Sequence, residues 1–247
     1  DFTPVESVLL VLKIPRTNDK QELAAEQLFA SLHGILRDNK ELRLSGGHQE
    51  HISFEIASVN GQIRFYVWVP KILQSFVEGQ IYSQYPTVQI HQADEDYTEH
   101  ERDHEVAYST ELTLTTDEFL PIRTFQNFEV DPLAGITGTL AKLETTGEEL
   151  WIQVLVRPIP DDWQNAADRY INSIKNGRMF SLPGFGGSMQ WLIGVLGALW
   201  QPPEQGANQS TVVELSDRDK TRISEAEKKA TKLGYEVKIR LVYMGES

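Results

Sequence analysis

Hydrophobic residues near the start of the chain follow first a strand-like and then a helix-like pattern. Residues 8–14 are a dense run of Val and Leu that ends at Pro15, which predicts a strand buried on both faces. Apolar residues then recur at helical spacing up to Leu36, and Asp19 stands three residues before Glu22 in the spacing of a capping box. We expect a helix with one buried stripe in this region.

The next segments predict a β-hairpin. Apolar and polar residues alternate over residues 52–56 and again over residues 63–69, and the pair Asn60-Gly61 stands between them. Asn-Gly readily adopts the two positive φ angles of a type I′ turn, whose twist matches that of the flanking strands. The hairpin therefore has its turn at Asn60 and Gly61.

A second helix and a last strand complete a recognisable order of elements. A helical stripe follows Pro70 and ends before Pro86, and residues 87–90 have the pattern of a short strand. The order strand, helix, strand, strand, helix, strand is the split βαβ, or ferredoxin-like, arrangement. We expect a first ferredoxin-like unit over residues 5–92, with both helices on one face of an antiparallel sheet.

Acidic residues and His dominate the segment from Asp94 to Glu105, and we find no apolar residue in it that would anchor the segment to a core. We expect a solvated linker over residues 93–106. The strand and helix pattern then restarts at Tyr108, and we expect a second ferredoxin-like unit over residues 107–247.

The second unit is predicted to carry a helical insertion at about residues 158–214, whose first helix is capped by Asp161 or Asp162. Its other predicted elements are a strand that includes Leu112 and Leu114, a helix after Asp131-Pro132, a buried strand at 150–156, a charged helix at 216–233 and a closing strand at 237–243. The predicted fold class is α+β: two ferredoxin-like units with antiparallel sheets and helices on one face.

The composition excludes several classes of protein. Lys and Arg number 23 against 36 Asp and Glu, which gives a net charge of −13, so we expect no direct contact with nucleic acid. Cysteine is absent, which excludes a disulfide scaffold, a thiolate zinc site and a cysteine nucleophile. The chain begins without Met and without an apolar leader, and we expect it to be a segment of a longer protein.

The sharpest motif in the chain is His100-Glu101-Arg102-Asp103-His104, which matches the HExxH pattern of zinc peptidases. In a working zinc site such a helix is packed in the core, which holds the ligands rigidly. Charged residues surround this motif instead. We interpret it as a solvated loop, with adventitious metal binding by His100 and His104, or a catalytic zinc site, as the alternatives.

No other motif provides catalytic chemistry. Gly46-Gly47-His48, with His51 nearby, has the composition of a turn. Residues 135–142 come nearest to a phosphate-binding loop but fail its spacing, and the GxSxG motif is absent. We predict no catalytic residue, no cofactor and no resident metal.

The stretch from Met179 to Pro203 contains no charged residue. Its apolar part is shorter than the roughly 20 residues that a membrane-spanning helix needs. Such a segment is buried in the domain's own core, against a partner or neighbouring subunit, or by shallow membrane contact. The candidate partner or membrane contacts are Phe185, Trp191, Leu192, Leu196 and Trp200.

Five strings in the chain resemble one known family: AAEQLFASLHGIL, ISFEIASVNGQIRFYVWVPK, FVEGQIYSQYPTVQI, NFEVDPLAGITGTLAKLE and ELWIQVLVRP. They are similar to the N-terminal, pre-motor region of type IV secretion, conjugative-transfer ATPases of candidate-phylum bacteria of the Patescibacteria type. The similarity extends over nearly the whole chain. It implies a membrane anchor before this region and a hexameric P-loop ATPase after it.

The resemblance implies a non-catalytic assembly and docking domain on the cytoplasmic side of the cell membrane. The expected partners are other copies of the chain and secretion-channel or membrane-proximal proteins. Because the chain has neither the anchor nor the Walker motif, no active-site residue is carried over from the family. The alternative is a metal-dependent hydrolase that uses His100, Glu101 and His104.

Overall fold

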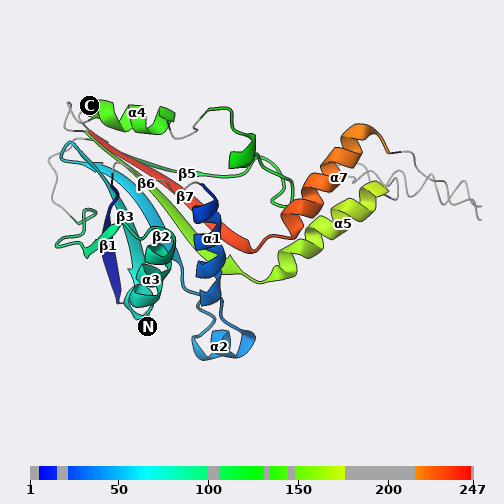
Figure 1. The fold of residues 1–247 in the computed structure, drawn as a ribbon, viewed down its shortest axis with the longest axis horizontal. Helices are drawn as coiled ribbons and strands as arrows, with labels where there is room; N and C mark the ends of the chain where they lie inside the picture. Colours follow the sequence, from blue (N-terminus) through cyan, green and yellow to red (C-terminus); the bar gives the residue numbers. More distant parts are fainter. Residues whose placement is uncertain are drawn as a thin grey trace, which may run out of the picture. The chain divides into compact units, whose positions relative to one another are not determined.

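One antiparallel sheet of seven strands forms the framework of the protein, in the order β4-β1-β3-β2-β6-β7-β5 (Figure 1). The computed structural model describes residues 6–15, 22–99, 106–130, 134–143, 148–175 and 215–245. The strands are β1 (Ser7–Lys13), β2 (Ile52–Val59), β3 (Gln62–Pro70), β4 (Gln89–Gln92), β5 (Val106–Leu112), β6 (Glu149–Ile159) and β7 (Gly234–Gly245).

The α+β class is confirmed, but the expectation of two separate sheets is wrong. β2 pairs with β6 in antiparallel register, with Ile52 opposite Val156 and Ser58 opposite Leu150. Strands from both halves of the chain are therefore neighbours in one sheet. β2 is buried along most of its length, as is typical of a central strand. β6 is its neighbour on the side away from β3.

Both halves of the chain use the same connectivity. In the first half, α1 (Glu22–Leu32) joins β1 to β2, and β3 lies between these two parallel strands. In the second half, α4 (Ala134–Leu143) joins β5 to β6, and β7 lies between them. The helix α3 (Gln74–Gln84) joins β3 to β4, so the strands and the two helices that we predicted for the first ninety residues occur in the predicted order.

The predicted hairpin is confirmed in detail. Asn60 and Gly61 connect β2 to β3, and both residues have a positive φ, of 51° and 69°. These are the left-handed conformations that a type I′ turn needs and that Asn and Gly adopt at low cost.

The main hydrophobic core lies between the sheet and the helices α1 and α3, which cover the same face (Figure 1). Leu28 and Leu32 of α1 and Val77 and Ile81 of α3 belong to one buried cluster with strand residues of both halves. The strand members of this cluster are Val8, Leu10, Ile52, Val67, Val69 and Val156. The core is therefore shared across the junction of β2 and β6.

A contact with β7 fixes the end of α1 on the second half of the sheet. The Tyr235 hydroxyl donates a hydrogen bond to the carbonyl oxygen of Phe29 at 2.5 Å, and its ring meets those of Phe29 and His33 edge-on. Burial raises the pKa of Tyr235, which keeps the phenol protonated as a donor. His33 Nε2 lies 3.3 Å from the carbonyl oxygen of Ile159, so this histidine is satisfied structurally.

Several element boundaries differ from the predicted ones. The first helix ends at Leu32, a short 3-10 turn follows at His33–Ile35, and an extra helix, α2 (Asn39–Leu44), was not predicted. Asp38 caps α2 and forms a capping box with Glu41. At the next boundary Pro70 is the last residue of β3, and a 3-10 turn at Lys71–Leu73 precedes α3.

The helices α5 (Gln164–Lys175) and α7 (Asp217–Ala230) pack together in a second compact unit, which also includes residues 118–121. Its small core contains Ile171, Ile223 and Ala226. Lys229 Nζ donates to the carbonyl oxygens of Glu118 and Leu120, so the strand-connecting segment is tied to this helix pair. Short 3-10 turns lie at Phe125–Asn127 and Asp161–Trp163.

The described residues of the predicted insertion agree with a helix after Asp162, and Ser216 caps α7 as a helix start should. The charged helix ends at Ala230 instead of Leu233, and Gly234 already belongs to β7. No described helix is both long enough and apolar enough to cross a membrane. The predicted boundaries at residues 92 and 107 stay predictions.

Candidate functional site

A row of polar and aromatic residues crosses the face of the sheet opposite to α1 and α3. Glu55 of β2 lies opposite Tyr66 of β3 on one side and Gln153 of β6 on the other, and Gln153 lies opposite Arg240 of β7. Side chains at directly opposed positions share one face of a sheet. Glu55 and Gln153 are both buried, and burial is unusual for a carboxylate on a face that no described helix covers.

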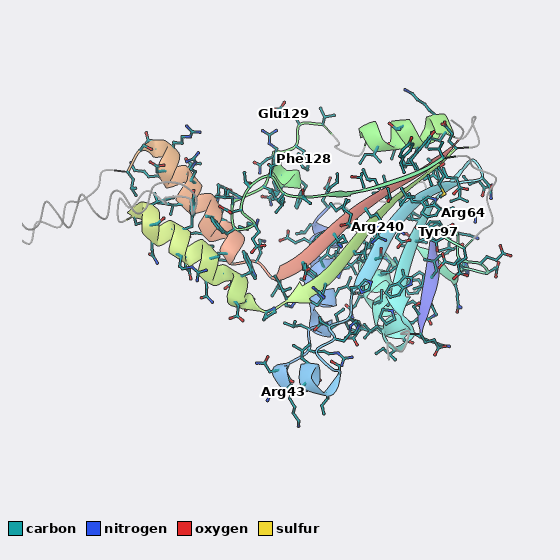
Figure 2. The ribbon with its side chains drawn as sticks, turned by 180° about the vertical axis from the view of Figure 1, so that it is seen from behind. Arg43, Arg64, Tyr97, Phe128, Glu129 and Arg240 are labelled. Atoms are coloured by element: carbon teal, nitrogen blue, oxygen red, sulfur yellow. The ribbon has the colours of Figure 1, made fainter. Side chains whose placement is uncertain are left out.

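Tyr97, which is labelled in Figure 2, contacts the middle of this row. Its ring stacks on Tyr66 at 4.8 Å between centroids and meets Trp151 edge-on at 4.9 Å. Its hydroxyl donates a hydrogen bond to Glu55 Oε2 at 2.5 Å and accepts one from Gln153 Nε2 at 3.0 Å. We call these five residues, Glu55, Tyr66, Tyr97, Trp151 and Gln153, the Tyr97 cluster.

Tyr97 corrects the expectation of a solvated linker. It lies within the acidic run after Asp94, yet only 2% of its surface is exposed. Ala93 donates a backbone hydrogen bond to Leu9, which starts the segment along β1, and Asp96 closes a turn by accepting from Thr98. The described part of the predicted linker, up to residue 99, is therefore anchored on the sheet.

The electrostatics of the Tyr97 cluster keep the phenol neutral. Burial, and then the adjacent Glu55 carboxylate, raise the pKa of Tyr97 well above its usual value. A protonated phenol can donate to Glu55 at any physiological pH. The Tyr97 hydroxyl thus links Glu55 and Gln153 in a buried hydrogen-bond network, which stabilises the fold.

His51 lies at the edge of the same face and stacks on Trp68, with ring centroids 4.8 Å apart. Burial lowers the pKa of His51, and the nearby charges of His48 and Arg157 lower it further. The turn predicted before it is confirmed, since Gly46 and Gly47 have φ angles of 68° and 84°. The stacking on Trp68 gives His51 a structural role. Among the described residues, no third potential metal ligand joins His48 and His51.

A small cavity of about 370 Å³ opens beside the Tyr97 cluster. Ser53, Glu55 and Gln153 line it together with two tryptophans, Trp68 and Trp151. The Ser53 hydroxyl is fully buried and has no hydrogen-bond partner among the residues that the structure describes. A buried hydroxyl without a partner carries a free-energy cost, which a bound ligand would remove.

A second cavity, of about 870 Å³, lies on the helix-covered face and is lined mainly by apolar side chains. Leu28 and Phe29 of α1, Ile136 of α4, and Ile152 and Ile239 of the sheet are among them. This lining can hold apolar groups but does not bring polar side chains together for chemistry.

The residues that the sequence singled out as metal or contact candidates lie outside the described residues. They are His100 and His104 of the HExxH match and Phe185, Trp191, Leu192, Leu196 and Trp200 of the apolar stretch. Within the described ranges, no group of three or more potential metal-ligating side chains occurs.

A different set of exposed apolar residues was missed by the sequence analysis. Between Leu112 and Val130 the chain has little regular structure, and it leaves several large apolar side chains in contact with solvent. These side chains are Leu112, Leu114, Ile122, Phe125, Phe128 and Val130, which we call the 112–130 segment. Phe128 and its neighbour Glu129 are labelled in Figure 2.

The structure is an α+β domain with one antiparallel sheet, the buried Tyr97 cluster on one face of that sheet and the exposed apolar 112–130 segment. The family model described as "Domain of unknown function (DUF8128)" matches residues 5–247, and the chain belongs to this family. Neither the curated proteins nor the solved structures include a significant match to the chain.

Proposed function

We propose that this chain is a non-catalytic docking domain of a membrane-tethered, type IV secretion-like ATPase. It would hold the motor against neighbouring subunits, the secretion channel or other proteins at the cytoplasmic side of the membrane. The family resemblance of the sequence supports the link to the ATPase, and the surface of the domain supports a binding role.

The 112–130 segment is the observation that carries this proposal. Ile122 is 62% exposed and Val130 is 76% exposed, and four more large apolar side chains accompany them within the same short stretch. Soluble domains rarely expose so many large apolar residues close together unless a partner covers them. Charged neighbours such as Glu129 are typical of the rim of an interface.

The edge of the sheet adds a second means of docking. β5 is the last strand of the sheet and pairs only with β7 among the described strands. Its outer edge therefore presents unpaired backbone donors and acceptors, to which an extended segment of a partner can add as a further strand. The apolar residues Leu112 and Leu114 lie at the end of this strand and just beyond it.

We also propose that the two halves of the domain are related ferredoxin-like units joined through β2 and β6. Each half has two parallel strands connected by a helix, with a third, antiparallel strand between them. The first half adds α3 and β4, for which the second half has no counterpart among the described elements. In the chain, the helices α5 and α7 come between β6 and β7.

The docking role predicts reversible self-association through the 112–130 segment. In sedimentation velocity we expect the wild-type chain to form oligomers in the range of roughly 10–100 µM. The triple substitution Ile122→Ser, Phe128→Ser and Val130→Ser should weaken association at least tenfold, which is about 1.4 kcal/mol, because it removes the apolar contacts.

A matched variant separates this surface from general surface hydrophobicity. Leu44, Ile72 and Val237 are 80%, 74% and 50% exposed and lie outside the 112–130 segment. Their triple substitution to Ser should leave the association constant unchanged. A monomeric wild type over the whole concentration range, or equal effects of both triple variants, would contradict the proposal.

The proposal also predicts that the purified chain retains no stoichiometric zinc. The HExxH match would give one zinc per chain if His100 and His104 were the ligands of a hydrolase. Elemental analysis after gel filtration, on the wild type and on His100→Ala, measures this directly. One retained zinc in the wild type that disappears in His100→Ala would favour the hydrolase over the docking domain.

A further inference from the structure

We propose that the 370 Å³ cavity beside the Tyr97 cluster binds an organic cation, the ammonium or guanidinium end of a basic side chain of a docking partner. The identity of the cation as a partner's side chain rests on the proposed docking function. The residues that line the cavity support the binding of a cation independently of that function.

The polar groups of the cavity are mainly hydrogen-bond acceptors. Glu55 is buried, and only its Oε2 atom receives the hydroxyl of Tyr97, so Oε1 is available to a ligand. Asp96 contributes a second carboxylate at the rim. Gln153 donates its amide to Tyr97, which leaves its carbonyl oxygen as an acceptor. A ligand that donates several hydrogen bonds fits this arrangement.

The aromatic walls favour a positive charge over a neutral donor. Trp68 and Trp151 both line the cavity, and indole rings attract ammonium and guanidinium groups through their π faces. Trp151 is buried, and a cation–π contact is stronger at a desolvated ring than at an exposed one.

Ser53 is the independent sign that a ligand belongs in this cavity. Its side chain lines the cavity, its residue is 3% exposed, and its hydroxyl oxygen is without any hydrogen-bond partner. Ser53 lies opposite Trp68 on β3 and Leu155 on β6, which also line the cavity, and an ammonium or guanidinium N–H that reached its oxygen would satisfy it.

Arg240 also lines the cavity, and its positive charge repels a bound cation. Its guanidinium lies 3.6 Å from Glu111 on β5, and the same carboxylate lies 3.3 Å from Lys238, so Arg240 keeps a positive charge at the cavity. The two carboxylates of Glu55 and Asp96 outnumber this one guanidinium. The charge balance therefore favours a monovalent cation over an anion.

Direct titration of the 247-residue chain tests the cavity. We expect n-butylammonium and n-butylguanidinium chloride to bind saturably in isothermal titration calorimetry at constant ionic strength, and n-butanol to show no binding. Glu55→Gln should weaken cation binding at least tenfold, because it removes the charge at nearly constant volume. Ser53→Ala should weaken it about threefold, since it removes one acceptor.

Controls keep the test interpretable. Glu129→Gln removes the same charge at an exposed position and should bind the cations as the wild type does. If Glu55→Gln does not fold, the Ser53→Ala result decides. Equal binding of n-butanol and n-butylammonium, unchanged binding in Glu55→Gln and Ser53→Ala, or no binding at all would overturn the proposal.

A peptide distinguishes the source of the cation. Acetyl-Gly-Lys-Gly-amide should bind at least as tightly as n-butylammonium if a partner's side chain is the ligand. Binding of the free amine alone would overturn the assignment to a protein partner and retain a small-molecule amine site. The triple variant of the 112–130 segment should bind both cations normally, so the cavity and the docking surface can fail independently.

Discussion

Replacing Tyr97 with Ala is expected to lower the free energy of unfolding by about 3–5 kcal/mol, the usual cost of removing a large buried aromatic ring. The loss combines the empty volume against Tyr66 and Trp151 with the hydrogen bonds that Glu55 and Gln153 no longer make. Urea denaturation followed by far-UV circular dichroism measures it. A solvated linker after β4 would give no loss of this size.

Two further variants divide the effect of Tyr97. Tyr97→Phe keeps the ring but leaves the buried Glu55 and Gln153 without their common partner, and we expect a loss of about 1–3 kcal/mol. Tyr82→Ala on the exposed face of α3, where the ring is 41% exposed, should cost within about 1 kcal/mol. A Tyr97→Ala variant as stable as Tyr82→Ala would show that the segment does not anchor on the sheet.

Substitutions in the two halves of the sheet should act on one unfolding transition. Leu10→Ala in β1 should cost about 2–5 kcal/mol and Val156→Ala in β6 about 1–3 kcal/mol, because both side chains lie in the same buried cluster. Hydrogen exchange of the β1 and β7 amides reports each half separately. Both variants should accelerate exchange in both strands by similar factors.

Independent folding of the two halves would give a different result. If the two halves folded independently, Val156→Ala would accelerate exchange in β7 and leave β1 protected. Val237→Ala, at a half-exposed position of β7, serves as the control and should change exchange little in either strand. This experiment tests the junction of β2 and β6 without cutting the chain.

Local sequence signals identified the elements whose stability is local. Asn60-Gly61 requires only its own backbone angles and the two flanking strands, so the hairpin followed directly from the sequence. The capping box of Asp38 and Glu41 is equally visible as a spacing, but the six residues of α2 bury no side chain and give no apolar stripe, so α2 was not predicted.

Long-range pairing left no comparable signal. The alternation in β2 shows which side chains share a face but does not show whether β6 or solvent lies at its outer edge. Tyr97 was missed for a related reason, since one aromatic residue within an acidic run has no periodicity. Its anchoring depends on Tyr66, Glu55, Trp151 and Gln153, which come from three different strands.

The candidate site around Tyr97 was not predicted. The HExxH match and the apolar stretch drew attention because they are contiguous in the sequence, and both lie outside the described residues. The cavity beside Tyr97 is assembled from residues far apart in the chain, and only the register of the sheet brings them together. The 112–130 segment had a weak signal, namely large apolar residues without any regular spacing.

The pairing of β5 with β7 also determines when the protein can fold during its synthesis. Val106 lies opposite Gly245, so β5 leaves the ribosome long before the strand that holds it. β6 likewise waits for β7 to complete its second edge. Such distant pairings slow folding, and the nascent chain has to keep two incomplete strands from aggregation until β7 has been made.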